Sequence, residues 1–111
     1  MSENRIAETP RPPYYAVIFT SLRTEGDDGY GEMAERMFAL VSGREGFLGM
    51  ESVRGEDGFG MTVCYWQTLE GIKQWKQEAE HQAAQALGQE RWYRNYRARI
   101  CKVEEDYGMS I

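Results

Sequence analysis

The sequence predicts an α+β domain with the element order β-α-β-β-α-β. Three observations support this fold class: strand-like runs rich in β-branched and aromatic residues, two amphipathic stretches with helical spacing, and a short glycine-bearing turn that joins two of the runs. This order is the split βαβ, or ferredoxin-like, arrangement. A chain of 111 residues has room for one such domain.

The first strand and the first helix occupy the N-terminal third of the chain. Tyr14–Leu22 is apolar on both alternating faces, which indicates a strand covered on both sides. Asp27 or Asp28 can cap the helix that follows, and Gly43 is a natural stop. Its apolar stripe at helical spacing comprises Tyr30, Met33, Ala34, Met37, Phe38 and Val41.

The next two strands form a predicted hairpin. Phe47–Arg54 is the second strand and Phe59–Trp66 is the third. The segment Gly55–Gly58 between them is rich in glycine and acidic residues, as tight turns are.

A second helix and a fourth strand complete the fold. Thr68 is the expected cap of the helix, whose apolar side carries Leu69, Ile72, Trp75 and Ala79. A further helical segment, with room for a kink, continues through Glu80–Leu87 to Gly88. Trp92-Tyr93 is assigned to a connection, and Asn95–Val103 to the fourth strand.

The predicted sheet is apolar on both faces, although the chain encodes helices for only one. In the first strand, Tyr15, Val17 and Phe19 alternate with Tyr14, Ala16 and Ile18; in the third, Phe59, Met61, Val63 and Tyr65 alternate with Cys64 and Trp66. An uncovered apolar face calls for a partner. We therefore expect a homodimer through the sheet faces.

Composition narrows the classes of function. The net charge of -5 argues against a nucleic-acid partner. Residues 1–13 lack the apolar core of a signal peptide and read as a flexible, proline-containing arm, and no apolar run is long enough to span a membrane. Cys64 and Cys101 have no metal-like spacing and are expected to be buried thiols of a cytoplasmic protein.

An ordered series of residues resembles the antibiotic biosynthesis monooxygenase (ABM) superfamily, and within it the YqjZ-like branch. The series comprises Tyr14–Ser21, Asp28–Tyr30, Gly46–Gly49, Glu51-Ser52, Thr62–Trp66, Trp75, His81 with Ala84, Gly88, Trp92-Tyr93, Tyr96 and Arg99-Ile100. It places the domain at residues 14–107 and leaves 108–111 as a tail. No short motif within it is diagnostic; the order over that length carries the resemblance.

The resemblance implies a dimeric α+β barrel with a pocket between the sheet and the helices of each subunit. Similar proteins include oxygenases that oxidise aromatic polyketides without metal or flavin, heme-degrading enzymes and quinol monooxygenases. The resemblance predicts the fold of this chain far better than it predicts a reaction.

The candidate site residues follow from the resemblance and from residue chemistry. The catalytic candidates are His81, Trp66 and Trp75; the candidates for substrate binding are Phe19, Tyr65, Trp92, Tyr93 and Tyr96. His81, the only histidine, can shuttle a proton or bind a ligand hydroxyl, and its alternative role is structural. The aromatic residues can line a pocket for a planar molecule, and their alternative role is core packing.

The pattern of heme-degrading relatives is incomplete here. That branch resembles this chain at Trp75, but the first strand has Thr20 and Ser21 where those enzymes carry an asparagine, and Gln85 lies near the position of their heme-ligating histidine. The chain also lacks a glycine-rich phosphate loop and the HExxH and CxxC motifs. We expect no metal and no cofactor.

Two main hypotheses remain from the sequence. The first is a cofactor-independent monooxygenase that acts on a small aromatic or quinone-like molecule. The second is a non-catalytic dimeric module that binds such a ligand, and a third possibility is a chain kept for its dimeric surface.

Overall fold

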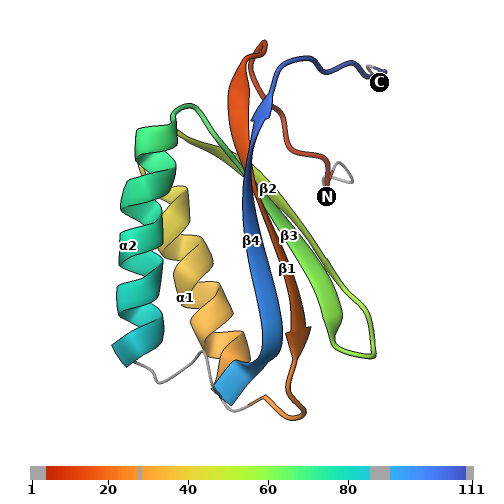
Figure 1. Cartoon of the computed structure of the whole chain (residues 1–111), viewed down its shortest axis with the longest axis vertical. Helices are drawn as coiled ribbons and strands as arrows, with labels where there is room; N and C mark the ends of the chain where they lie inside the picture. Colours follow the sequence, from red (N-terminus) through yellow and green to blue (C-terminus); the bar gives the residue numbers. More distant parts are fainter. Residues whose placement is uncertain (1–4, 28, 86–90, 110–111) are drawn as a thin grey trace.

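The computed structural model describes residues 5–27, 29–85 and 91–109 of the chain and contains an α+β fold (Figure 1). The observed element order confirms the predicted β-α-β-β-α-β arrangement. The elements are β1 (Tyr14–Arg23), α1 (Tyr30–Ser42), β2 (Phe47–Arg54), β3 (Phe59–Trp66), α2 (Leu69–Gln85) and β4 (Tyr93–Val103).

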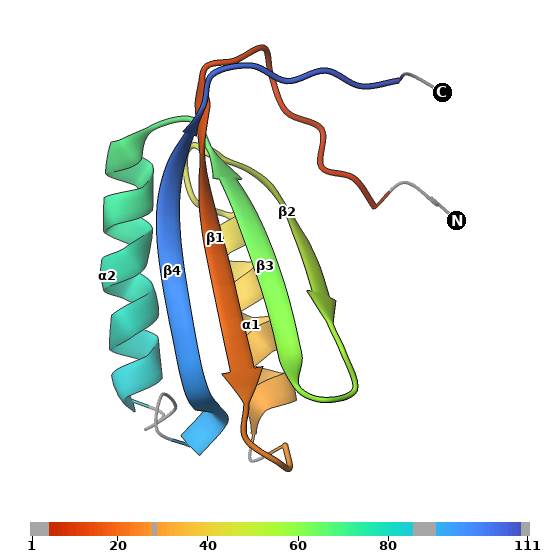
Figure 2. The same ribbon diagram turned by 45° about the vertical axis from the view of Figure 1, so that its right-hand side comes forward.

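The four strands form one antiparallel sheet in the order β2-β3-β1-β4. β1 therefore lies in the interior of the sheet, between β3 and β4, although it comes first in the chain. The two helices lie on the same side of the sheet, and no helix of the described residues lies on the other side (Figure 2). Within the described residues, no helix is long and apolar enough to cross a membrane.

The strand register defines which residues face the helices. Val17 in β1 lies opposite Cys64 in β3 and Ile100 in β4, and directly opposed residues point to the same face. Val17 and Cys64 pack against a buried cluster that includes Val41 of α1 and Ile72 of α2. Residues at every second position from Val17, Cys64 and Ile100 therefore lie on the helix-covered face of the sheet.

The other face, which we call the open face, keeps large apolar side chains in contact with solvent. Val53 is 69% exposed, Phe59 is 52% exposed and Met61 is 38% exposed. The prediction that strands one and three are apolar on both faces thus describes the sheet correctly.

Both ends of the described chain contact the same end of the open face. The Ala7 amide donates a hydrogen bond to Glu51 Oε2 (2.9 Å). Thr9 Oγ1 lies 3.0 Å from the Tyr14 hydroxyl, which donates to Asp106 Oδ2 at 2.6 Å. The arms on either side of the domain leave the sheet from this end (Figure 2).

The helix ends follow the predicted capping chemistry with one change. Thr68 Oγ1 accepts from the Gly71 amide (3.0 Å), which confirms the cap of α2. At α1, Gly29 is the cap residue, with φ of 84°, and the Asp27 carboxylate accepts from the amides of Gly29 and Gly31. Asp27 therefore supplies the acceptor from two residues before the cap, and Asp28 lies outside the described residues.

Two other details depart from the sequence prediction. Tyr93 is the first residue of β4, so placing it in a connection was wrong. Phe38 was assigned to the core stripe of α1 but is 54% exposed. The helical continuation predicted from Glu80 is confirmed as far as Gln85, where it forms part of the single helix α2; the rest of it, to Gly88, lies outside the described residues.

Candidate functional site

Five aromatic side chains converge at the end of the helix-covered face where β1 ends and α1 and β4 begin. Phe19 stacks on Tyr96 with ring centroids 5.3 Å apart and meets Tyr93 edge-on at 5.6 Å. Tyr30 meets Tyr93 at 6.0 Å and Trp92 at 6.1 Å, both edge-on. We call these residues the aromatic cluster. Three of the predicted substrate-binding residues, Phe19, Tyr93 and Tyr96, are thus in mutual contact, and Trp92 joins them through Tyr30.

The cluster is accessible from the β4 side. Tyr96 is 40% exposed and Ile100, two register positions further along the same face, is 55% exposed. Trp92 is 5% exposed and lies behind Tyr30. A planar ligand could therefore reach the Tyr96 side of the cluster, whereas Trp92 supports it from within.

Two arginines flank Tyr30. The Arg23 guanidinium carbon lies 3.6 Å from the centroid of the Tyr30 ring, a close cation–π contact, and that of Arg54 lies 5.8 Å away. Arg54 also lies 3.5 Å from the Tyr30 hydroxyl and donates to the buried Ser21 Oγ at 2.7 Å. Gly60 makes room for Arg54, because a Cβ there would lie 2.7 Å from the guanidinium carbon.

The pKa of Tyr93 depends on its burial and on the groups around it. Burial raises the pKa of Tyr93, and its interaction with the neighbouring Tyr30 hydroxyl raises that pKa further. The positive charges of Arg54 and Arg23 act in the opposite direction. The Tyr93 hydroxyl thus stays protonated near neutral pH, where it can donate a hydrogen bond, while the arginines favour any negative charge that a ligand brings.

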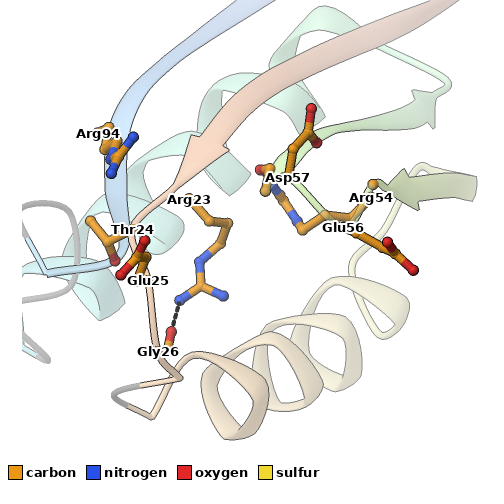
Figure 3. Close-up of a pocket in the computed structure, with 10 residues that line it drawn as sticks. Arg23, Thr24, Glu25, Gly26, Arg54, Glu56, Asp57 and Arg94 are labelled. Carbon is orange, nitrogen blue, oxygen red and sulfur yellow. Dashed lines mark hydrogen bonds between the residues drawn. The ribbon is translucent and has the colours of Figure 1, made fainter.

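A cavity of about 420 Å³ opens beside these arginines, between the β1–α1 loop and the β2–β3 hairpin (Figure 3). Arg23 and Arg54 belong both to its lining and to the surroundings of Tyr30. Its lining comprises Arg23, Thr24, Glu25, Gly26, Arg54, Gly55, Glu56, Asp57, Gly58 and Arg94.

The two tryptophans predicted to be catalytic lie away from this cluster: Trp66 is buried in the core, and Trp75 is partly buried against it. Trp66 is fully buried against Phe47 and the cluster of Val41 and Ile72, and Trp75 packs on the same group. The Trp66 Nε1–H is a buried donor that has no hydrogen-bond partner in the described part of the structure. Such an orphan donor is costly, so a ligand oxygen or a water that reached it would be stabilised.

Tyr65 and His81 lie elsewhere. Tyr65 faces the open side of the sheet, where its hydroxyl donates to Glu51 Oε1 at 2.6 Å. Burial and this hydrogen bond raise the pKa of Tyr65. His81 is exposed on α2. Tyr65 therefore cannot share one wall with Trp66, its neighbour on the opposite face.

Cys64 and Cys101 are free thiols on opposite faces of the sheet. Burial raises the pKa of Cys64 to about 11, so this thiol remains protonated near neutral pH. No group of three His, Cys, Asp or Glu side chains suited to a metal ion occurs within residues 5–27, 29–85 and 91–109.

Three residues of the site, Tyr30, Arg23 and Arg54, were not among the sequence candidates. The sequence did contain an indication of Arg54. Arg54 lies on the same face of β2 as Met50, which faces the helices, and a charged residue on a covered face is unusual. Tyr30 was assigned to the core stripe, where its hydroxyl had no evident role.

Two comparisons with known sequences bear on identity. The family model described as antibiotic biosynthesis monooxygenase matches residues 13–87. The uncharacterised protein YqjZ of Bacillus subtilis (strain 168) is 52% identical over 99 residues, which cover 89% of this chain and 87% of the relative. The chain belongs to the antibiotic biosynthesis monooxygenase family. These two findings confirm the family that the ordered series of residues predicted.

Solved structures with low sequence identity share this fold. A mutant form of SnoaB from Streptomyces nogalater, a cofactor-independent oxygenase, superposes with a TM-score of 0.69 at 7% identity; the match covers 84% of this chain and 95% of SnoaB. PA3566 from Pseudomonas aeruginosa gives 0.64 at 15% identity and covers 89% of this chain and 100% of PA3566. At such identities, the agreement concerns the fold.

Proposed function

We propose that this ABM-family protein is a cofactor-independent monooxygenase that acts on a small aromatic or quinone-like molecule bound at the aromatic cluster. The observation that supports it most is the edge-on contact of two phenols, Tyr30 and Tyr93, with the guanidiniums of Arg23 and Arg54 over the Tyr30 ring. The fold shared with an oxygenase that needs no cofactor is consistent with this proposal.

The proposed chemistry uses the substrate as the source of electrons. An acidic carbon of an anthrone-type substrate loses its proton, and the resulting anion is stabilised by the two arginines and by phenol hydrogen bonds. The anion transfers one electron to O₂, and the two radicals combine into a peroxide anion, which takes up the proton that the substrate carbon had lost and becomes a hydroperoxide. Loss of water from the hydroperoxide leaves a new carbonyl group, so that one oxygen atom enters the product and the other leaves as water.

Oxygen uptake with anthrone tests this activity. Tyr93→Phe and Arg54→Met are expected to lower kcat/KM by about 10- to 100-fold, because each removes a group that stabilises the substrate anion. The matched control is Tyr107→Phe, since Tyr107 is fully exposed on the C-terminal arm. Wild-type activity in both site variants would contradict the proposed site, and absence of uptake by the wild-type protein would contradict the activity.

The alternative is a non-catalytic module that binds an aromatic ligand. One observation favours it: none of the side-chain contacts described for Tyr30, Tyr93 and Tyr96 involves a carboxylate or an imidazole. A general base must therefore come from the phenols themselves or from the solvent. Saturable binding of an anthrone without oxygen uptake, in air, would select this alternative.

A homodimer through the open face is part of the proposal. The exposed Val53, Phe59 and Met61 on that face supply the apolar area that a second copy would cover. Light scattering at micromolar concentration is expected to give about twice the chain mass of 12.8 kDa.

A matched pair of variants locates the contact. Phe59→Asp is expected to reduce the measured mass to that of one chain, because it places a charge in the interface. Phe38→Asp, on α1 and equally exposed at 54% against 52%, is expected to leave the mass unchanged. A wild-type mass of one chain, or equal effects of both variants, would exclude this interface.

A further inference from the structure

Arg23 and Arg54 are two half-buried cations at the Tyr30 ring, and no carboxylate of the described residues pairs with either. Arg23 donates to the backbone oxygens of Trp92 (3.1 Å) and Gly26 (3.1 Å), and Arg54 donates to Ser21 Oγ and the Gly58 backbone oxygen. Neither guanidinium forms an ion pair with a carboxylate of the described residues. Neutral acceptors hold the side chains in place but leave their charges uncompensated.

The acidic residues that line the same cavity do not cancel these charges. Glu25, Glu56 and Asp57 are all exposed, where water and salt screen them. Asp57 Oδ1 accepts from the Phe59 amide within the hairpin, which holds that carboxylate at the turn.

The geometry also fixes the arginines in position before any ligand arrives. Gly60 leaves the space that the Arg54 guanidinium occupies across β3, and the buried Ser21 hydroxyl holds it there. The Tyr30 ring supports Arg23 at 3.6 Å. Guanidiniums held this way lose little conformational entropy when they bind an anion.

We infer that this cavity is the subsite for an anionic group of the ligand, a carboxylate on an aromatic ring, and that Arg23 and Arg54 recognise it. The inference rests on the proposed function and deepens it, because it names the substrate class: hydroxyarenes that carry a carboxylate. The two arginines form the shared wall between the cavity and the Tyr30 side of the aromatic cluster. The carboxylate takes the cavity, and the ring of the ligand lies against this guanidinium wall, whose other side contacts Tyr30.

Binding of an unreactive ligand pair tests this subsite separately from catalysis. The full chain is titrated calorimetrically with 1-hydroxy-2-naphthoate and with 1-hydroxy-2-naphthamide. The two ligands share one ring system and differ only in whether it carries a charged carboxylate or an uncharged amide. The naphthoate is expected to bind roughly tenfold or more tightly than the amide, and increasing salt is expected to reduce that preference. Equal affinities, or no binding of the naphthoate, would overturn the inference.

Variants assign the preference to residues. Arg54→Met and Arg23→Met are expected to abolish it, and Arg94→Met, on the exposed wall of the cavity, is expected to reduce it while leaving the fold intact. The control is Arg97→Met, which lies opposite Thr20 on the other face of the sheet. A preference that survives Arg54→Met and Arg23→Met in folded protein, or that Arg97→Met removes equally, would contradict the assignment. Because anthrone carries no carboxylate, its oxidation by the wild-type protein tests the monooxygenase proposal independently of this subsite.

Discussion

Replacement of Trp66 by alanine is expected to lower the free energy of unfolding by about 3–5 kcal/mol, the range for truncation of a large buried aromatic side chain. Trp66 is the largest fully buried side chain described, and it joins β3 to Val41 of α1 and Ile72 of α2. Its loss would leave a cavity at the point where both helices meet the sheet. Urea denaturation followed by circular dichroism measures the change.

Trp66→Phe separates packing from hydrogen bonding at this position. Since Nε1 has no partner among the described residues, its removal costs no hydrogen bond, and we expect a loss of only about 1–2 kcal/mol. Tyr107→Ala, on an exposed arm, is the control and is expected to change the unfolding free energy by less than about 0.5 kcal/mol. If Trp66→Phe costs as much as Trp66→Ala, the indole N–H is bonded in solution.

Gly60→Ala is expected to destabilise the fold by about 1–3 kcal/mol, because an added methyl group overpacks the site. The new Cβ would lie 2.7 Å from the Arg54 guanidinium carbon and 2.9 Å from the Val53 carbonyl oxygen. Relief of this contact would require Arg54 to leave Ser21, which is buried and depends on it for a hydrogen bond. The same urea experiment applies, with Gly108→Ala, in open space, as the control.

A double-mutant cycle tests the physical reason for this effect. In an Arg54→Ala background, the added methyl group meets only the backbone contact, so Gly60→Ala should cost less than it does in the wild-type chain. Equal costs in both backgrounds would show that the Val53 carbonyl, and not the guanidinium, determines the requirement for glycine.

The sequence was sufficient for the fold wherever local patterns and packing agree. Alternation in Tyr14–Leu22 predicted a strand buried on both faces, and Thr68 predicted the start of α2. Tyr93 was placed outside the last strand because no alternation marks its start. In the structure Tyr93 belongs to β4 and contacts Phe19 and Tyr30, which are distant in the sequence.

The candidate site was harder to predict because side chains of similar chemistry separate in space. Tyr65 and Trp66 are neighbours in the chain, but a strand sends them to opposite faces. Trp66 and Trp75 pack at the Val41–Ile72 end of the helix-covered face, while Tyr93 and Tyr96 gather at the other. The alternation of residues along each strand predicted which side chains share a face of the sheet. It did not predict that Arg54 meets Tyr30, 24 positions away in the sequence, because that contact depends on how the elements pack in three dimensions.

The strand order has a consequence for how the chain folds during synthesis. β1 is made first and lies between β3 and β4, yet β4 is the last element to be made. Until Tyr93–Val103 has left the ribosome, one edge of β1 presents unpaired backbone groups beside apolar side chains, a surface prone to aggregation. The Tyr14–Asp106 hydrogen bond spans 92 positions, so closure of the sheet is a long-range event that must await the synthesis of β4 and of Asp106 after it.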